Sequence, residues 1–254
     1  MDAFTRKVGG GNPAAVCLLP SWPSNDVLQL IASENNLSET AFLVQRAKGR
    51  YALRWFTPKV EIDLCGHATL ASAFAVFSFM EPALSSVCFE TASGPLPVER
   101  DGELLSMDFP SRRPVPVKAP PALAGALGAE PSDVLKSRDL MAVFGDESAV
   151  KDMEPDFAGL SGIHDAFAVI VTAPGKTCDF VSRFFAPNAG IPEDPVTGSA
   201  HCTLVPYWAD RLGKSRLRAL QLSSRGGELF CEHMNERVKI SGHAVLYARG
   251  EIYI

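Results

Sequence analysis

Two stretches of this chain place an acid and a glycine at the same spacing in front of a helix-like segment. They read RWFTPKVEIDLCGHATL over residues 54–70 and RFFAPNAGIPEDPVTGSAHCTL over residues 183–204. Both begin with Arg, an aromatic residue and Phe, and both have a Glu five residues before the Gly. A glycine-led turn into a helix directs backbone N–H groups forward, where they could hold a small carboxylate. A tight turn at each glycine is the simpler alternative, but the repetition with matching acids favours an anion site.

Three side chains near these stretches could exchange protons. Glu39 precedes an apolar segment; at the edge of an apolar cleft its pKa would rise and it could act as an acid or a base, although it could also be an acid in a turn. His67 follows the first glycine, where the helix N-terminus disfavours a cation, so we expect a neutral imidazole that donates or relays a proton, or else a structural histidine. Asp194 could position His67, hold a substrate group or cap the second helix.

Cys65 stands at the head of the first helix, where a thiolate would be stabilised. Because no second thiol is placed to assist it, we interpret it as a packed neighbour of the site rather than a nucleophile. Asp63, Cys65 and His67 alternate, but this spacing lacks the paired ligands of zinc sites. We therefore expect no metal at this position.

The two stretches are 129 positions apart, about half of the 254 residues. A repeat of this length predicts two similar lobes with the site where they meet. We place the N-terminal lobe at 1–109 and the C-terminal lobe at 110–254, with the last strand free to return to the first lobe. The helix behind Gly66 is apolar on every face and should be buried, whereas the one behind Gly198 is interrupted by Pro206. Strand-rich lobes that each enclose one helix predict the α+β class.

The composition excludes several classes of function. A net charge of −5 without blocks of like charge argues against nucleic acid and against an anionic membrane. The longest apolar run, 68–80, is too short to span a bilayer. Six scattered cysteines without a C-x-x-C pair favour reduced thiols in a cytoplasmic protein.

Six short motifs together resemble the phenazine-biosynthesis isomerase (PhzF-like) family. They are DAFT (2–5), GNP (11–13), SET (38–40), FTP (56–58), CGHAT (65–69) and EDPVTGSAH (193–201). The last is the most specific, and the resemblance covers the chain from Asp2 to its end. It implies the diaminopimelate epimerase fold, with two pseudo-symmetric lobes, each a barrel-like β-sheet around a central helix, and the site in the cleft between them.

The resemblance also implies an enzyme that moves a proton on a small carboxylic acid without a cofactor, often as a homodimer. Glu39 matches the family's proton-transferring carboxylate, and His67 and Asp194 match polar partners at the site. The turns that hold the substrate match Gly66, Gly198 and Ser199.

One departure from the wider fold bears on the mechanism. Its epimerases and racemases have a Cys at the head of each central helix. Here Cys65 occupies the first of these two positions, and Thr197 occupies the second. A threonine hydroxyl without an adjacent base is a poor proton acceptor, so we do not expect two-thiol racemisation. We expect a cofactor-independent isomerase that uses Glu39, His67 and Asp194. The alternatives are a single-thiol epimerase that uses Cys65, and a non-catalytic protein that binds a small acid or a partner.

Overall fold

The chain passes twice between two structural units in the computed structural model, which describes residues 1–253. The first unit comprises Met1–Asp108 together with the C-terminal segment that begins at Ser241, and the second is Phe109–Ile240. The boundary that the sequence placed after residue 109 lies one position from the point where the chain first enters the second unit, after Asp108. The C-terminal segment belongs to the first unit, which is the return that the sequence left open for the last strand. The final residue of the chain lies outside the described residues.

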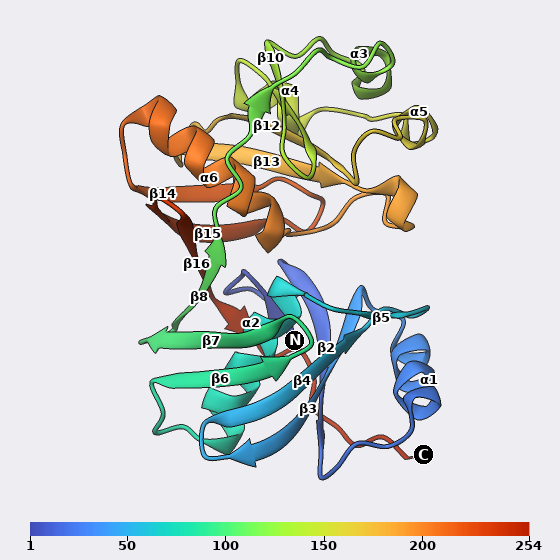
Figure 1. The fold of residues 1–254 in the computed structure, drawn as a ribbon, viewed down its shortest axis with the longest axis vertical. Helices are drawn as coiled ribbons and strands as arrows, with labels where there is room; N and C mark the ends of the chain where they lie inside the picture. Colours follow the sequence, from blue (N-terminus) through green and yellow to red (C-terminus); the bar gives the residue numbers. More distant parts are fainter. Residues whose placement is uncertain (254) are drawn as a thin grey trace. The chain divides into compact units, whose positions relative to one another are not determined.

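The first unit is a sheet whose strands lie around helix α2 (Figure 1). Its strands are β1 (Asp2–Ala3), β2 (Asn12–Leu19), β3 (Glu39–Ala47), β4 (Arg50–Phe56), β5 (Glu61–Ile62), β6 (Ser86–Thr91), β7 (Gly94–Asp101), β8 (Leu104–Pro110) and β17 (Ala244–Val245). Its helices are α1 (Asn25–Asn35), α2 (Gly66–Ala75) and the π-helical turn η1 (Val76–Met80). Of the ten residues of α2, eight are buried, as the apolar sequence behind Gly66 predicts.

The second unit repeats this plan around helix α6. Its strands are β9 (Val115–Pro116), β10 (Asp133–Lys136), β11 (Leu140–Val143), β12 (Val169–Pro174), β13 (Phe180–Phe185), β14 (Arg216–Gln221), β15 (Gly227–Met234) and β16 (Arg237–Gly242), of which β16 leads back to the first unit. Its helices are α3 (Leu123–Leu127), α4 (Glu147–Lys151), α5 (Phe157–Ser161), the 3-10 turn η2 (Pro187–Ala189) and α6 (Gly198–Leu212).

The strand pairing of the two units is the same. In the first, β2 and β3 are parallel, β3 and β4 antiparallel, β4 and β6 parallel, and β6 and β7 antiparallel. In the second, β11 and β12, β12 and β13, β13 and β14, and β14 and β15 follow the same order of orientations. The central helix follows β4 in one unit and β13 in the other. The α+β class and the pseudo-symmetric, epimerase-like architecture expected from the sequence are therefore confirmed.

Helix α6 is continuous through Pro206, so the interruption expected there is wrong. A proline inside a helix cannot donate to the carbonyl four residues earlier, which is that of Cys202. The backbone N–H of Arg112 donates to this carbonyl instead, at 2.9 Å. The proline is therefore accommodated because a neighbouring segment supplies the missing hydrogen bond. Within residues 1–253, no helix is long and apolar enough to cross a membrane.

His201 on α6 is fully buried, and its Nδ1 donates to the carbonyl oxygen of Thr197 at 2.8 Å. Its ring lies against Phe180, with 5.8 Å between ring centroids. Burial disfavours the charged imidazolium and lowers the pKa of His201 to about 4.

We therefore expect acid to destabilise the protein through His201. Between its ordinary pKa of 6.5 and about 4, the unfolded chain binds a proton that the folded chain does not. Over this range the free energy of unfolding should fall by about 3 kcal/mol. Urea unfolding at a series of pH values measures this loss, and His201→Gln is the control, because its stability should fall less steeply. Parallel curves for the two proteins would contradict the prediction.

Candidate active site

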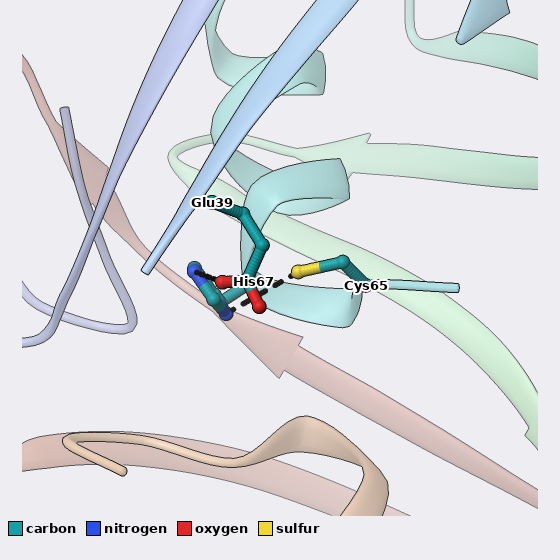
Figure 2. A group of neighbouring side chains, drawn as sticks. All are labelled: Glu39, Cys65 and His67. Carbon is teal, nitrogen blue, oxygen red and sulfur yellow. Dashed lines mark hydrogen bonds and ion pairs between the residues drawn. The ribbon is translucent and has the colours of Figure 1, made fainter. Parts of the chain in front are cut away.

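Three functional side chains meet at the head of α2 in the first unit (Figure 2). Glu39 is the first residue of β3, Cys65 is the N-cap residue of α2, and His67 lies in the first turn of that helix. Because α2 packs against β3, the start of the strand and the start of the helix bring these residues together. Nε2 of His67 lies 3.1 Å from Oε2 of Glu39, and its Nδ1 lies 3.5 Å from Sγ of Cys65.

The cluster is almost closed to solvent. Glu39, Cys65 and His67 are 8%, 7% and 6% exposed. Oε2 of Glu39 and Nε2 of His67 are at ion-pair distance, but neither atom makes a well-directed hydrogen bond to any part of the chain that the structure describes. Each atom is the other's electrostatic partner across 3.1 Å, in an ion pair that the fold encloses.

The charges in the cluster differ from those expected from the sequence. Burial acts to raise the pKa of Glu39, but the neighbouring His67 outweighs it, and the pKa of the carboxyl is lowered overall. Burial likewise acts against the charged form of His67, yet Cys65 and Glu39 raise its pKa well above the ordinary value. The raised pKa expected for Glu39 and the neutral imidazole expected for His67 are both wrong. The pair is instead a carboxylate facing an imidazolium, because mutual attraction exceeds the cost of burial.

Cys65, which the sequence suggested to be a packed neighbour of the site, belongs to the cluster itself. Burial raises the pKa of its thiol, and the charge of Glu39 raises it further, so that the thiol stays protonated. A protonated thiol is a weak hydrogen-bond donor. The alternation of Cys65 and His67 was visible in the sequence, but the third member, Glu39, is 26 positions away and joins them only in the fold.

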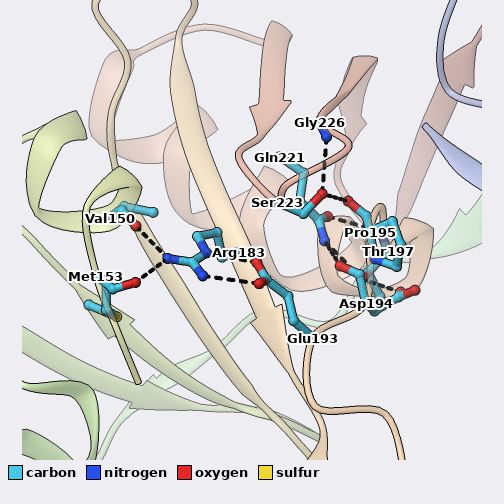
Figure 3. Close-up of polar contacts among 10 residues, drawn as sticks. All are labelled: Val150, Met153, Arg183, Glu193, Asp194, Pro195, Thr197, Gln221, Ser223 and Gly226. Atoms are coloured by element: carbon cyan, nitrogen blue, oxygen red, sulfur yellow. Dashed lines mark hydrogen bonds and ion pairs between the residues drawn. The ribbon is translucent and has the colours of Figure 1, made fainter. Parts of the chain in front are cut away.

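Asp194 lies in the second unit, in the loop before α6 (Figure 3). The hydroxyl of Thr197 donates to its carboxylate, and its backbone carbonyl accepts a hydrogen bond from Nε2 of Gln221 at 2.8 Å. Oε1 of Gln221 also accepts from the backbone N–H of Thr197, at 2.8 Å. Gln221, which the sequence analysis missed, thus fixes the loop that carries Asp194. No sequence signal marks this residue, because it lies on β14, beyond the helix.

The matching acids of the two stretches pair with the matching arginines. Arg54 donates to Glu61 through Nε and Nη2, at 2.6 and 2.7 Å, and Arg183 donates to Glu193 through the same two atoms, at 2.7 and 3.0 Å. Figure 3 shows the second pair, in which Arg183 also donates to the carbonyls of Val150 and Met153. The acids that seemed to favour an anion site therefore fasten each loop to its own strand.

Gly198 and Ser199 form the start of α6, as expected for a turn that holds a substrate. The N-cap residue, Thr197, makes no capping hydrogen bond with its side chain. Nη2 of Arg138 donates to Oγ of Ser199 at 3.3 Å, while the charge of this guanidinium is paired with the carboxylate of Asp139 through Nε and Nη2, at 2.9 and 2.7 Å. The uncapped N-terminus of α6 by itself favours a negatively charged group at this position.

The six candidate residues therefore fall into two groups. Glu39, Gly66 and His67 belong to the first unit, together with Cys65. Asp194, Gly198 and Ser199 belong to the second. The first group has the acid–base side chains in contact, and the second has a helix start without a side-chain cap. That the two groups form one site stays a prediction.

A buried carboxylate in contact with an imidazole at the head of a central helix is an arrangement suited to acid–base catalysis. The profile of the phenazine biosynthesis-like protein family matches residues 1–250, and the chain belongs to this family. The chain is 52% identical to an uncharacterised isomerase of Pseudomonas aeruginosa over 254 residues, which cover all of this chain and 97% of the relative. The expected PhzF-like isomerase is thus confirmed at the level of the family.

Solved structures agree with this assignment. A phenazine biosynthesis protein of the PhzF family from Enterococcus faecalis matches with a TM-score of 0.97 and 49% identity, covering 100% of this chain and 97% of that one. A predicted epimerase from Pseudomonas aeruginosa matches with a TM-score of 0.74 over 100% of this chain and 97% of that one. Its identity is 20%, so this likeness shows the fold alone.

Proposed function

We propose that this protein is a cofactor-independent isomerase that moves a proton on a small carboxylic acid bound where the two units meet. The contact between Glu39 and His67, buried and poor in hydrogen bonds, is the observation that carries the proposal. Family membership supports the reaction class, and the uncapped N-terminus of α6 supports an acidic substrate.

In this mechanism the carboxylate of Glu39 takes a proton from a carbon of the substrate. The electron pair left behind shifts along the substrate, and the same carboxyl group returns the proton at another carbon, so that substrate and product are isomers. The imidazolium of His67 keeps Glu39 ionised and offsets negative charge that develops on the substrate. The start of α6, with Gly198 and Ser199, holds the substrate carboxylate, and Asp194 positions a polar group of the substrate.

A single-thiol epimerase is the second candidate, favoured by the contact between Cys65 and His67. In that reaction the thiol would donate a proton to one face of a carbon after Glu39 had removed one from the other face. The raised pKa of Cys65 suits a proton donor but not a thiolate base. A protein that only binds a small acid would use the same residues without turnover.

Deuterium exchange tests the proposal. The protein is incubated in D₂O with a panel of small unsaturated and hydroxylated carboxylic acids, and products are followed by NMR. We expect at least one acid to change its double-bond position. Inversion of a single carbon with one deuterium gained would favour the epimerase. Tight binding of an acid that never exchanges or rearranges would favour the binding protein.

We expect metal chelators to leave folding unchanged and not to lower activity. The reason is that Glu39 and His67 supply the acid–base chemistry themselves, so no metal is needed to acidify the substrate. Thermal unfolding and turnover, measured before and after dialysis against a chelator, check this. A loss of turnover that added Zn²⁺ or Mn²⁺ restores would contradict it.

We also propose that the protein works as a homodimer in the cytoplasm. All six cysteines are unpaired, which fits a reducing compartment. Sedimentation analysis tests the dimer, and a monomer at all concentrations would contradict it.

A further inference from the structure

We propose that the cluster of Glu39, Cys65 and His67 is a binding site for Zn²⁺, and that the bound ion blocks the enzyme. The zinc is an inhibitor here and not a cofactor, so the proposal agrees with a reaction that needs no metal. Zinc binding itself follows from the cluster alone, whereas its inhibitory effect rests on the proposed function.

The donor set selects the metal. A thiolate, an imidazole and a carboxylate are the three ligand types that Zn²⁺ takes in proteins, and three protein ligands leave a fourth position for water or a substrate group. Mg²⁺ and Ca²⁺ require oxygen ligands and would not use the thiol or the imidazole. A borderline-soft divalent cation is therefore the expected occupant.

The geometry of the cluster fits this ion. One donor atom from each of the three side chains lies within 4.8 Å of the other two. Bond lengths of about 2.3 Å to sulfur and about 2.0 Å to nitrogen put the two donors about 3.5 Å apart across a tetrahedral ion. Sγ of Cys65 and Nδ1 of His67 are 3.5 Å apart. These two ligands are already at the separation that zinc requires, and the carboxylate of Glu39 completes the set.

The other ring nitrogen of His67, Nε2, already faces Oε2 of Glu39 at 3.1 Å, so that Nδ1 is the nitrogen left for an ion beside the sulfur. Binding by Sγ of Cys65, Nδ1 of His67 and the carboxylate of Glu39 displaces the thiol proton and one imidazolium proton. No electron is transferred, so the balance is two protons released for each ion bound. Affinity should accordingly rise with pH.

Inhibition follows because the ion occupies the groups that move the proton. Glu39 coordinated to zinc cannot take a proton from carbon, and His67 can no longer carry a full positive charge. Removing the ion restores both groups. The cluster therefore gives the enzyme a reversible response to free zinc.

The test uses chelator-treated full-length protein and Co²⁺, which replaces Zn²⁺ in such sites and shows a thiolate-to-metal absorption band. We expect one Co²⁺ ion per chain and a charge-transfer band that Zn²⁺ abolishes by displacing the cobalt. Cys65→Ser should lose the band, and its affinity for the metal should be at least about 100-fold weaker, since even residues behind metal ligands contribute about 10- to 100-fold. Cys88→Ser is the matched control, because Cys88 is a half-buried thiol on β6 of the same unit and should leave binding unchanged. Binding that survives in Cys65→Ser, or that Cys88→Ser abolishes, would overturn the proposal.

A second measurement needs no variant. Calorimetric titration of Zn²⁺ in buffers of different ionisation enthalpy counts the protons released, and we expect about two per ion. Release of none would overturn the site. Neither measurement uses a substrate, so the zinc site and the proposed isomerase activity can be rejected independently of each other. Deuterium exchange without stoichiometric zinc would reject the metal site alone, and zinc binding without any exchange would reject the isomerase alone.

Discussion

Replacing Glu39 with Gln should reduce turnover by about 10²- to 10⁴-fold, the usual contribution of a positioned acid or base. The amide keeps the size of the side chain, but it can neither take up nor return a proton. Substrate affinity should change little, because the proposed carboxylate-holding groups lie at the start of α6. Turnover and affinity are measured separately, with an acid that the D₂O screen has identified.

Cys65→Ser is the matched variant, since it alters the same buried cluster without removing the carboxylate. We expect it to cost far less activity than Glu39→Gln, because the thiol takes no proton in the proposed reaction. Circular dichroism and thermal unfolding verify that both variants keep the fold. An inactive Cys65→Ser beside an active Glu39→Gln would replace the isomerase by the single-thiol epimerase.

The pKa values of Glu39 and His67 set the pH range over which the proposed reaction can run. The lowered pKa of Glu39 means that the carboxylate loses its charge only as the pH falls below its ordinary value of 4.5. The raised pKa of His67 means that its charge is lost only as the pH rises well above 6.5. Between these limits the carboxylate of Glu39 and the imidazolium of His67 are both present, so turnover should stay constant there and fall on either side.

Much of the architecture was predictable because the sequence repeats itself. The repeat revealed two equivalent strand–loop–helix segments, and the structure places them on β4 with α2 and on β13 with α6. The burial of α2 also followed from its composition. Such features depend on local pattern, which a single sequence displays directly.

Other features depend on contacts between distant residues and could not be predicted. Continuity of α6 through Pro206 requires the backbone of Arg112, which precedes it by 94 positions. The charges on Glu39 and His67 are set by their mutual distance, which no spacing in the sequence specifies. The same holds for the inclusion of Cys65 in the cluster.

The role of the matching acids is the clearest example, and it leads to a prediction about stability. In the second unit the side chains of Arg183 and Glu193 are 10% and 19% exposed, whereas those of Arg54 and Glu61 in the first unit are 25% and 39% exposed. Removing one partner of a buried ion pair leaves the other charge without compensation, which typically costs about 3–5 kcal/mol. An exposed pair contributes about 0–1 kcal/mol, because water solvates the remaining charge.

Glu193→Gln should therefore lower the free energy of unfolding by about 3 kcal/mol or more, and Glu61→Gln by less than about 1 kcal/mol. The larger effect has a second cause, since Arg183 also holds the carbonyls of Val150 and Met153 and would lose its orientation without the carboxylate. Urea unfolding measures both variants, and hydrogen exchange assigns the loss to one unit: amides of β13 and α6 should exchange faster in Glu193→Gln, while those of β4 and α2 keep their protection. Equal losses in the two variants would mean that burial does not decide the strength of this repeated pair, and that both glutamates contribute through the shared geometry of the loop.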